Sequence, residues 1–85
     1  MVKKSVEKFG RFQTRLAGRL AEYREDKGLS QAALAKKAGV KQQYISDIER
    51  RKRNPTLRSL VALADALDVQ PRDLLAGIPR EKYEE

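Results

Sequence analysis

The side chains of this sequence that could do chemistry are cations and amides. The densest group is the basic run from Arg50 to Arg53, followed by Asn54, and two adjacent amides stand upstream at Gln42 and Gln43. The chain has no His and no Cys, which removes imidazole catalysis, thiolate nucleophiles and the usual zinc ligands. Because the carboxylates form no nucleophile-and-base pair, we expect no enzyme, no metal and no cofactor.

The charge of the chain is strongly uneven along its length. Lys and Arg number 19 against 12 Asp and Glu, a formal net charge of +7, which favours a polyanionic partner and nucleic acid first. Residues 31–60 carry 8 basic and 2 acidic side chains, whereas residues 61–85 carry 3 and 6. We therefore expect one polarised binding surface in the middle of the chain.

Apolar residues recur at spacings of three and four, which predicts an all-helical fold. A first helix carries Leu16, Leu20 and Tyr23 on one face. It is expected to end near Lys27, because Gly28 suits the left-handed position that follows a helix.

The start of this first helix is left open by the sequence. Val6, Phe9 and Phe12 would extend its apolar stripe upstream. Gly10 and Gly18 oppose a long helix, since each weakens it by about 1 kcal/mol.

Two short helices joined by a tight turn are predicted next. Ser30 is a good N-cap for a helix over 31–38, and Gly39 ends it. A third helix runs from residue 42 to about residue 50. Small Ala35 and flexible Gly39 allow the two helices to cross steeply, and this spacing is the signature of a helix-turn-helix.

Two further helices follow the basic run. Thr56 is expected to cap a fourth helix, and Pro71 to begin a short fifth helix that Gly77 ends. The predicted apolar stripe of the fourth helix consists of Leu57, Leu60, Val61, Ala64 and Leu67.

Four segments resemble the phage repressor and Cro type helix-turn-helix family, and within that family the stretch Tyr44–Pro55 (YISDIERRKRNP) is most similar to the controller proteins of restriction-modification systems. The four segments are Gln31–Val40 (QAALAKKAGV), Tyr44–Glu49 (YISDIE), Asn54–Leu57 (NPTL) and Leu63–Leu67 (LADAL). The resemblance implies a compact five-helix, lambda-repressor-like domain over residues 12–78, after a basic N-terminal extension or arm at 1–11 and before a charged tail at 79–85. It also implies a sequence-specific regulator of transcription that binds double-stranded DNA as a homodimer on a pseudo-palindromic operator.

The resemblance assigns a role to each polar segment. The helix over 31–38 would lie across the DNA backbone, and the helix over 42–50 would enter the major groove, where a Gln amide can bond adenine N6 and N7. The residues then expected to contact bases are Gln42, Gln43, Tyr44, Ser46 and Arg50. The residues expected to contact phosphates are Gln31, Lys41, Arg51, Lys52, Arg53 and Asn54.

Three residues near the end of the helix over 42–50 do not fit a simple DNA-contacting surface. The family often has Gly where this chain has Arg51, so either the turn differs or phosphate attraction offsets a strain of roughly 1 kcal/mol. The role of Asp47 is left open, because a carboxylate is repelled by phosphates. The family also implies a partly buried ion pair between Arg24 and Glu49 that fixes the angle of this helix.

The partners expected are DNA and a second copy of the chain. The predicted dimer surface is the fifth helix, with Leu74, Leu75 and Ile78, since these residues otherwise lack cover. The alternative is an antitoxin or coactivator that chiefly binds another protein. The longest apolar run, 60–64, is far too short to span a bilayer and residues 1–12 lack the apolar core of a signal peptide, so a cytoplasmic location is expected.

Overall fold

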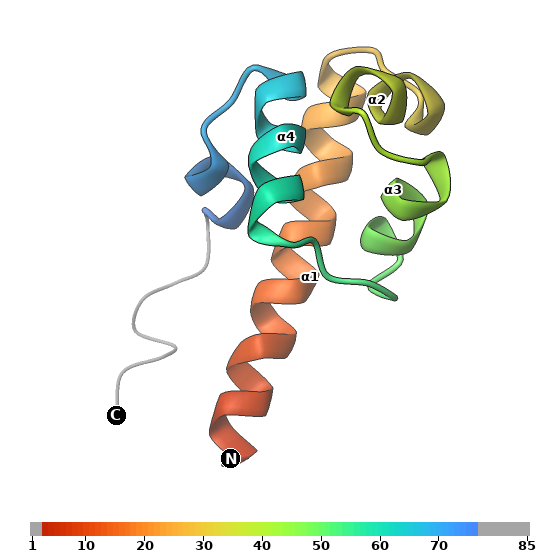
Figure 1. Ribbon diagram of the computed structural model, residues 1–85. Coiled ribbons are helices and arrows are strands. Elements are labelled where there is room, and N and C mark those ends of the chain that lie inside the picture. The colour runs from red at the N-terminus through yellow and green to blue at the C-terminus, as the bar shows by residue number, and fades with distance from the viewer. Residues whose placement is uncertain (1–2, 77–85) are drawn as a thin grey trace.

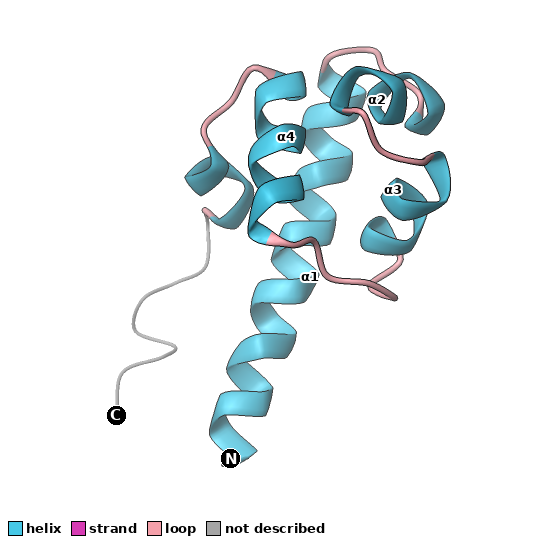
Figure 2. Ribbon diagram, viewed as in Figure 1, coloured by secondary structure: helices cyan, strands magenta, loops and turns pink. Residues whose placement is uncertain are grey.

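The computed structural model describes residues 3–76, and these residues form helices and short connections with no strand (Figure 2). The elements are α1 Lys3–Asp26, α2 Gln31–Ala38, α3 Gln42–Glu49, α4 Leu57–Leu67 and a 3-10 helix η1 Pro71–Leu75. The all-helical prediction is confirmed. The count of five helices is not confirmed: four elements are α-helices, and the last, which begins at Pro71, is a short 3-10 helix.

Each α-helix ends where the next residues turn left-handed, and this is what folds the chain back on itself. Gly28 and Gly39 have φ of 70° and 76°, as their positions predict. Arg51 and Asp68 adopt the same conformation, each with φ of 62°. The helices α2 and α4 begin at side-chain N-caps, as predicted. Ser30 Oγ accepts a hydrogen bond from the Ala33 backbone amide, and Thr56 Oγ1 accepts one from the Ser59 backbone amide.

The core contains side chains from all five elements. Figure 1 shows the other elements arranged around the C-terminal half of α1. The fully buried large members of the core are Leu20, Leu34, Ile45, Ile48, Leu63, Leu67 and Leu74. In α1 the core begins at Leu16, so the described part of the helix before that residue contributes no buried side chain. Figure 1 shows this N-terminal half projecting away from the other elements.

The apolar face predicted for α4 is wrong at two of its residues, which are exposed. Leu57 is 77% exposed and Val61 48% exposed, whereas Leu63 and Leu67 are fully buried. Because successive helical residues turn by roughly 100°, Leu57 and Val61 lie on a different flank from the buried pair. The two residues therefore form surface and not core.

The predicted dimer surface needs a second correction. Leu74 is fully buried, because η1 packs against both α1 and α4 and inserts this side chain into the core. Leu75 is partly buried against the same cluster. Ile78 and the tail at 79–85 lie outside the described residues, and the expected boundary between residues 11 and 12 falls inside the continuous helix α1.

Candidate nucleic-acid interface

One face of the helix α3 packs against the core, and the opposite face is exposed to solvent. Ile45 and Ile48, three residues apart, are buried at 0% and 2% exposure. Gln42 and Gln43 in the first turn are exposed, and Ser46 is half-buried. α3 packs against both α1 and α2, and these contacts fix where its backbone presents Gln42 and Gln43 on the surface.

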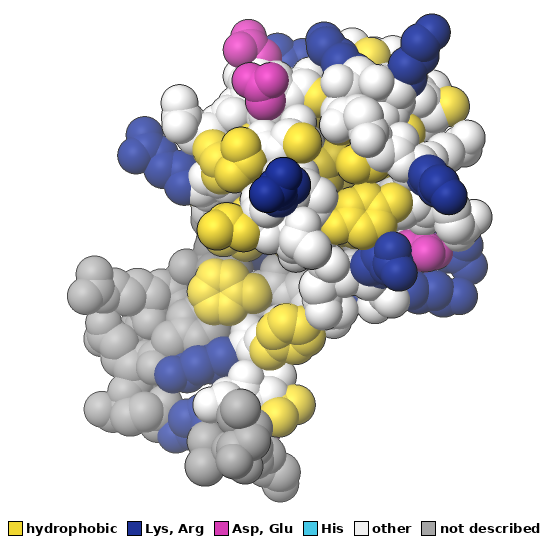
Figure 3. Space-filling view, in the orientation of Figure 1, with side chains coloured by type: hydrophobic (Ala, Val, Ile, Leu, Met, Phe, Trp, Pro, Cys, Tyr) yellow, Lys and Arg dark blue, Asp and Glu magenta, His cyan; other side chains and the backbone are white. Residues whose placement is uncertain are grey.

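Cations surround this outward face. Lys41 precedes α3, and Arg50 to Arg53 follow it, all of them exposed. Figure 3 shows Lys and Arg side chains over α2, α3 and the loop after α3, with an acidic side chain among them. Other cations are drawn along the projecting part of α1, and acidic side chains also lie near the end of α4. Exposed cations therefore stand at both ends of the face of α3 that meets solvent, where they would attract a polyanion.

Arg24 and Glu49 are brought together in a bidentate ion pair. Arg24 Nε lies 2.7 Å from Glu49 Oε2, and Nη2 lies 3.1 Å from Oε1. The third guanidinium nitrogen donates to the Leu29 carbonyl at 2.8 Å, and only 12% and 9% of the two side chains are exposed. The hydrogen bonds that Arg24 donates to the Glu49 carboxylate raise the pKa of Arg24 above its usual value. The pair ties the last residue of α3 to the last turns of α1.

Gln31 joins the same network. Its Nε2 donates to Glu49 Oε1 at 3.0 Å, which fixes the amide at the first residue of α2. An amide nitrogen carries two hydrogens, so a second donor remains. The structure thus gives Gln31 a place in the ion-pair network that sequence reasoning did not foresee.

Tyr44 turns back towards the start of α4. Its hydroxyl lies 2.6 Å from Ser59 Oγ and accepts a hydrogen bond from the Thr56 amide at 3.2 Å. The Arg53 guanidinium sits over its ring, 5.4 Å from the centroid, within cation–π range. The hydroxyl therefore bonds within the protein, and the ring supports the basic loop.

The exposed face of α3 contains one internal contact. Gln43 Nε2 donates to Asp47 Oδ1 at 2.9 Å, one turn further along the helix. Asp47, whose role the sequence left open, thereby orients one of the two leading amides.

Arg51 adopts the left-handed backbone conformation that favours Gly. Its φ is 62°, its amide donates to the Ile48 carbonyl at 3.0 Å, and the Lys52 amide donates to the Asp47 carbonyl at 2.7 Å. These two bonds form the Schellman motif that closes a helix. Of the two alternatives left open by the sequence, the different turn is ruled out and the strain is present.

The loop after α3 is also held from the opposite side. Gln13 Nε2 in α1 donates to Asn54 Oδ1 at 2.9 Å, across 41 residues of sequence. Sequence reasoning missed Gln13, because a polar residue on a predicted helix gives no sign of a partner so distant. The loop that carries Asn54 is thus anchored to α1 as well as to α3.

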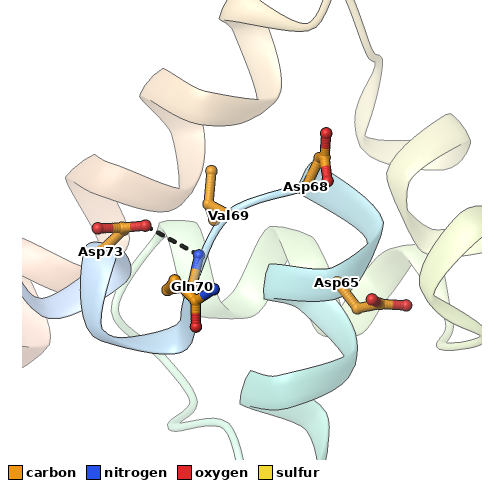
Figure 4. A pocket seen from close by; sticks show the side chains of 5 residues that line it. All are labelled: Asp65, Asp68, Val69, Gln70 and Asp73. Atoms are coloured by element: carbon orange, nitrogen blue, oxygen red, sulfur yellow. Dashed lines mark hydrogen bonds between the residues drawn. The ribbon is translucent and has the colours of Figure 1, made fainter.

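A hollow elsewhere on the described surface has the wrong charge for nucleic acid. It measures about 310 Å³ between α4 and η1 and is lined by Asp65, Asp68, Val69, Gln70 and Asp73 (Figure 4). The Asp73 carboxylate accepts a hydrogen bond from the Gln70 backbone amide at 2.8 Å. The carboxylates of Asp65 and Asp68 point in different directions (Figure 4). Within residues 3–76, no cluster of side chains could hold a metal ion, and no helix is long and apolar enough to cross a membrane.

Comparisons with known proteins identify the family. A family model described as Helix-turn-helix matches residues 20–74. The control protein C.SmaI from Serratia marcescens is 42% identical over 69 residues, which cover 79% of this chain and 82% of that protein. The regulator SinR from Bacillus subtilis (strain 168) is 43% identical over 67 residues, covering 78% of this chain and 60% of SinR.

Solved structures agree with the sequence relatives. The restriction-modification controller protein C.AhdI from Aeromonas hydrophila has a TM-score of 0.71 and 42% identity, covering 73% of this chain and 94% of that one. SinR, solved in complex with DNA, has a TM-score of 0.68 and 41% identity, covering 71% of this chain and 97% of that one. The chain therefore belongs to the helix-turn-helix family of DNA-binding transcriptional regulators.

Proposed function

We propose that this chain binds a pseudo-palindromic operator in double-stranded DNA as a homodimer, with α3 in the major groove. The observation that carries the proposal is the outward face of α3. Its buried side rests on Ile45 and Ile48, and its exposed side presents Gln42 and Gln43 within a rim of cations. An α-helix fits the major groove, and Gln is one of the few side chains that can bond adenine bidentately.

The contacts divide into two groups by chemistry. Base contacts are assigned to Gln42, Gln43, Tyr44, Ser46 and Arg50, with Tyr44 contributing its ring because its hydroxyl is engaged within the protein. Phosphate contacts are assigned to Gln31, Lys41, Arg51, Lys52, Arg53 and Asn54. The Gln31 amide lies at the positive end of the α2 dipole, where a phosphate oxygen is favoured.

Two relatives narrow the proposal. C.SmaI and C.AhdI are named as control proteins, the latter of a restriction-modification system. Both match this chain over more than 80% of their own length. We extend the proposal to a regulator of this kind, and the proposed homodimer follows from the need for two reading heads about 34 Å apart on one side of the duplex.

Alanine substitutions at two residues separate base reading from charge. Gln43→Ala is expected to weaken binding to an operator selected from a random duplex library by about 1–3 kcal/mol, while leaving binding to duplex of random sequence nearly unchanged. Arg53→Ala is expected to weaken both and to reduce by about one the slope of log affinity against log salt concentration. Fluorescence anisotropy on both duplexes at several salt concentrations measures these quantities.

A matched control removes a cation elsewhere. Arg72 is exposed on η1, outside α2, α3 and the basic loop after α3. Arg72→Ala should leave the salt slope unchanged. If Gln43→Ala and Arg53→Ala lower both affinities equally, the proposed division between base and phosphate contacts is wrong.

A further inference from the structure

The two amides that begin α3 differ in what they contact inside the protein. Gln43 Nε2 donates a hydrogen bond to Asp47 Oδ1 at 2.9 Å, one helical turn further along. Gln42 is exposed as well, but its side chain makes no hydrogen bond to any residue in the described range 3–76. The two neighbouring amides therefore have different sets of hydrogen-bonding groups left for a ligand.

The Asp47 carboxylate fixes which way the Gln43 amide faces. A carboxylate oxygen only accepts hydrogen bonds, whereas a Gln side chain ends in a carbonyl oxygen that accepts and an NH2 group that carries two hydrogens. If the amide were turned over, its oxygen would face the carboxylate oxygen, and neither would have a donor. The amide nitrogen is therefore held towards Asp47, and the amide oxygen is directed away from it.

The bond to Asp47 also uses one of the two hydrogens of the Gln43 amide. What Gln43 can still offer to a base is one donor and one acceptor. Adenine presents the complementary pair in the major groove, the acceptor N7 and the donor N6. Guanine presents two acceptors, N7 and O6, and would need both hydrogens of the amide. The groups that remain on Gln43 thus match adenine and not guanine.

The Asp47 side chain contributes little else to the fold. It is half-buried, and among residues 3–76 no Lys or Arg forms an ion pair with it. Its backbone carbonyl accepts the Lys52 amide at 2.7 Å, a bond that any residue at this position can make. A carboxylate in the last turn of a helix is unfavourable, and one beside phosphates repels DNA of every sequence. The effect expected of this side chain is therefore on selectivity, and not on stability or affinity.

We propose that Asp47 determines specificity through Gln43, which it restricts to adenine and prevents from accepting guanine at one position of each half-site. In the groove, a Gln43 amide that turned both hydrogens to guanine would leave the desolvated carboxylate without a donor, which is costly. Asp47 is thus a positioning residue, and Gln43 makes the contact with the base. The inference deepens the proposed function and rests on it, because it requires α3 to lie in the major groove.

Selection from a random duplex library, carried out with the whole chain and with three variants, tests this proposal. The wild type should enrich adenine over guanine at the position whose preference is lost in Gln43→Ala. Asp47→Ala should accept both bases there, with their discrimination reduced about tenfold in fluorescence anisotropy. Asp47→Ala should also bind duplex of random sequence roughly two- to fivefold more tightly, because a negative charge is gone. Adding Asp47→Ala to Gln43→Ala should change no further base preference.

Two controls separate this effect from a general one. Asp65→Ala removes the same charge from the exposed surface of α4, and should leave base preference and binding to random duplex nearly unchanged. Because Ala favours the helix, Asp47→Ala should unfold at a temperature no lower than the wild type.

The outcomes distinguish this inference from the proposed function. If Asp47→Ala keeps the wild-type preference for adenine over guanine, the inference is overturned and the proposed function stands. The inference is also overturned if the double variant loses a preference that Gln43→Ala retains, since Asp47 would then contact a base itself. A wild-type chain that enriches no sequence refutes the proposed function and this inference with it.

Discussion

Replacing Arg51 by Gly should make the protein more stable and, at the same time, a weaker binder of DNA. Arg51 has φ of 62°, and its amide and that of Lys52 close α3 through bonds to Ile48 and Asp47. Glycine keeps both backbone bonds and needs no Cβ in the left-handed region. The substitution therefore removes strain without breaking any contact that the turn depends on.

The size of the gain follows from two opposing terms. The left-handed conformation of an L-residue destabilises the folded state by about 1–2 kcal/mol, and Gly removes this strain. The greater freedom of Gly in the unfolded chain opposes the gain by roughly 0.5–1 kcal/mol. The net stabilisation is about 0.5–1 kcal/mol, or roughly 2–8 °C in a domain of this size. Denaturant and thermal unfolding followed by circular dichroism measure it. On DNA, loss of the proposed phosphate contact should lower the salt slope by about one.

The chain contains its own matched control. Asp68 has the same φ of 62° after α4, on the acidic side of the molecule. Asp68→Gly should stabilise by less, because Asp tolerates the left-handed conformation better than Arg, and should leave DNA binding unchanged, while Arg50→Gly, at a φ of −93°, should destabilise. If Asp68→Gly stabilises and Arg51→Gly does not, the reasoning about the α3 turn is refuted.

Three further substitutions test the contacts around α3. Glu49→Met strands the buried Arg24 cation and should cost about 3 kcal/mol in unfolding free energy, more than Glu49→Met combined with Arg24→Met; a double variant less stable than the single one would contradict this. Tyr44→Phe should cost about 1 kcal/mol through its lost hydroxyl bonds, and an unchanged denaturation midpoint would show that the hydroxyl network contributes nothing. Gln13→Ala should leave unfolding nearly unaltered but weaken DNA binding several-fold, because Asn54 loses its anchor; equal affinities would dismiss that positioning role.

Local signals in the sequence were sufficient to predict where α2 and α4 begin and where α1 and α2 end. Ser30 and Thr56 can bond a nearby amide, and Gly28 and Gly39 favour the left-handed turn, so neighbours within a few residues decide these boundaries. The turn at Arg51 was undecided in the sequence because its outcome depends on how α3 packs, and no local preference selects it.

Longer-range features could not be read from spacing alone. The start of α1 depends on weak opposing terms, an apolar stripe against Gly10 and Gly18. The burial of Leu74 depends on where η1 docks, and the exposure of Leu57 on which flank of α4 meets the core. The Tyr44 hydroxyl network joins residues 15 apart whose distance only the folded chain determines.

Selection of bound fragments from a random duplex library tests the central claim most directly, because it reads the sequence that α3 recognises. We expect enrichment of a two-fold symmetric site whose half-sites are spaced by about one helical turn, with symmetric positions that become degenerate when the selection is repeated with Gln42→Ala and Gln43→Ala combined. Enrichment of no sequence, or of the same sequence by both proteins, would contradict the assignment of α3 as the reading element.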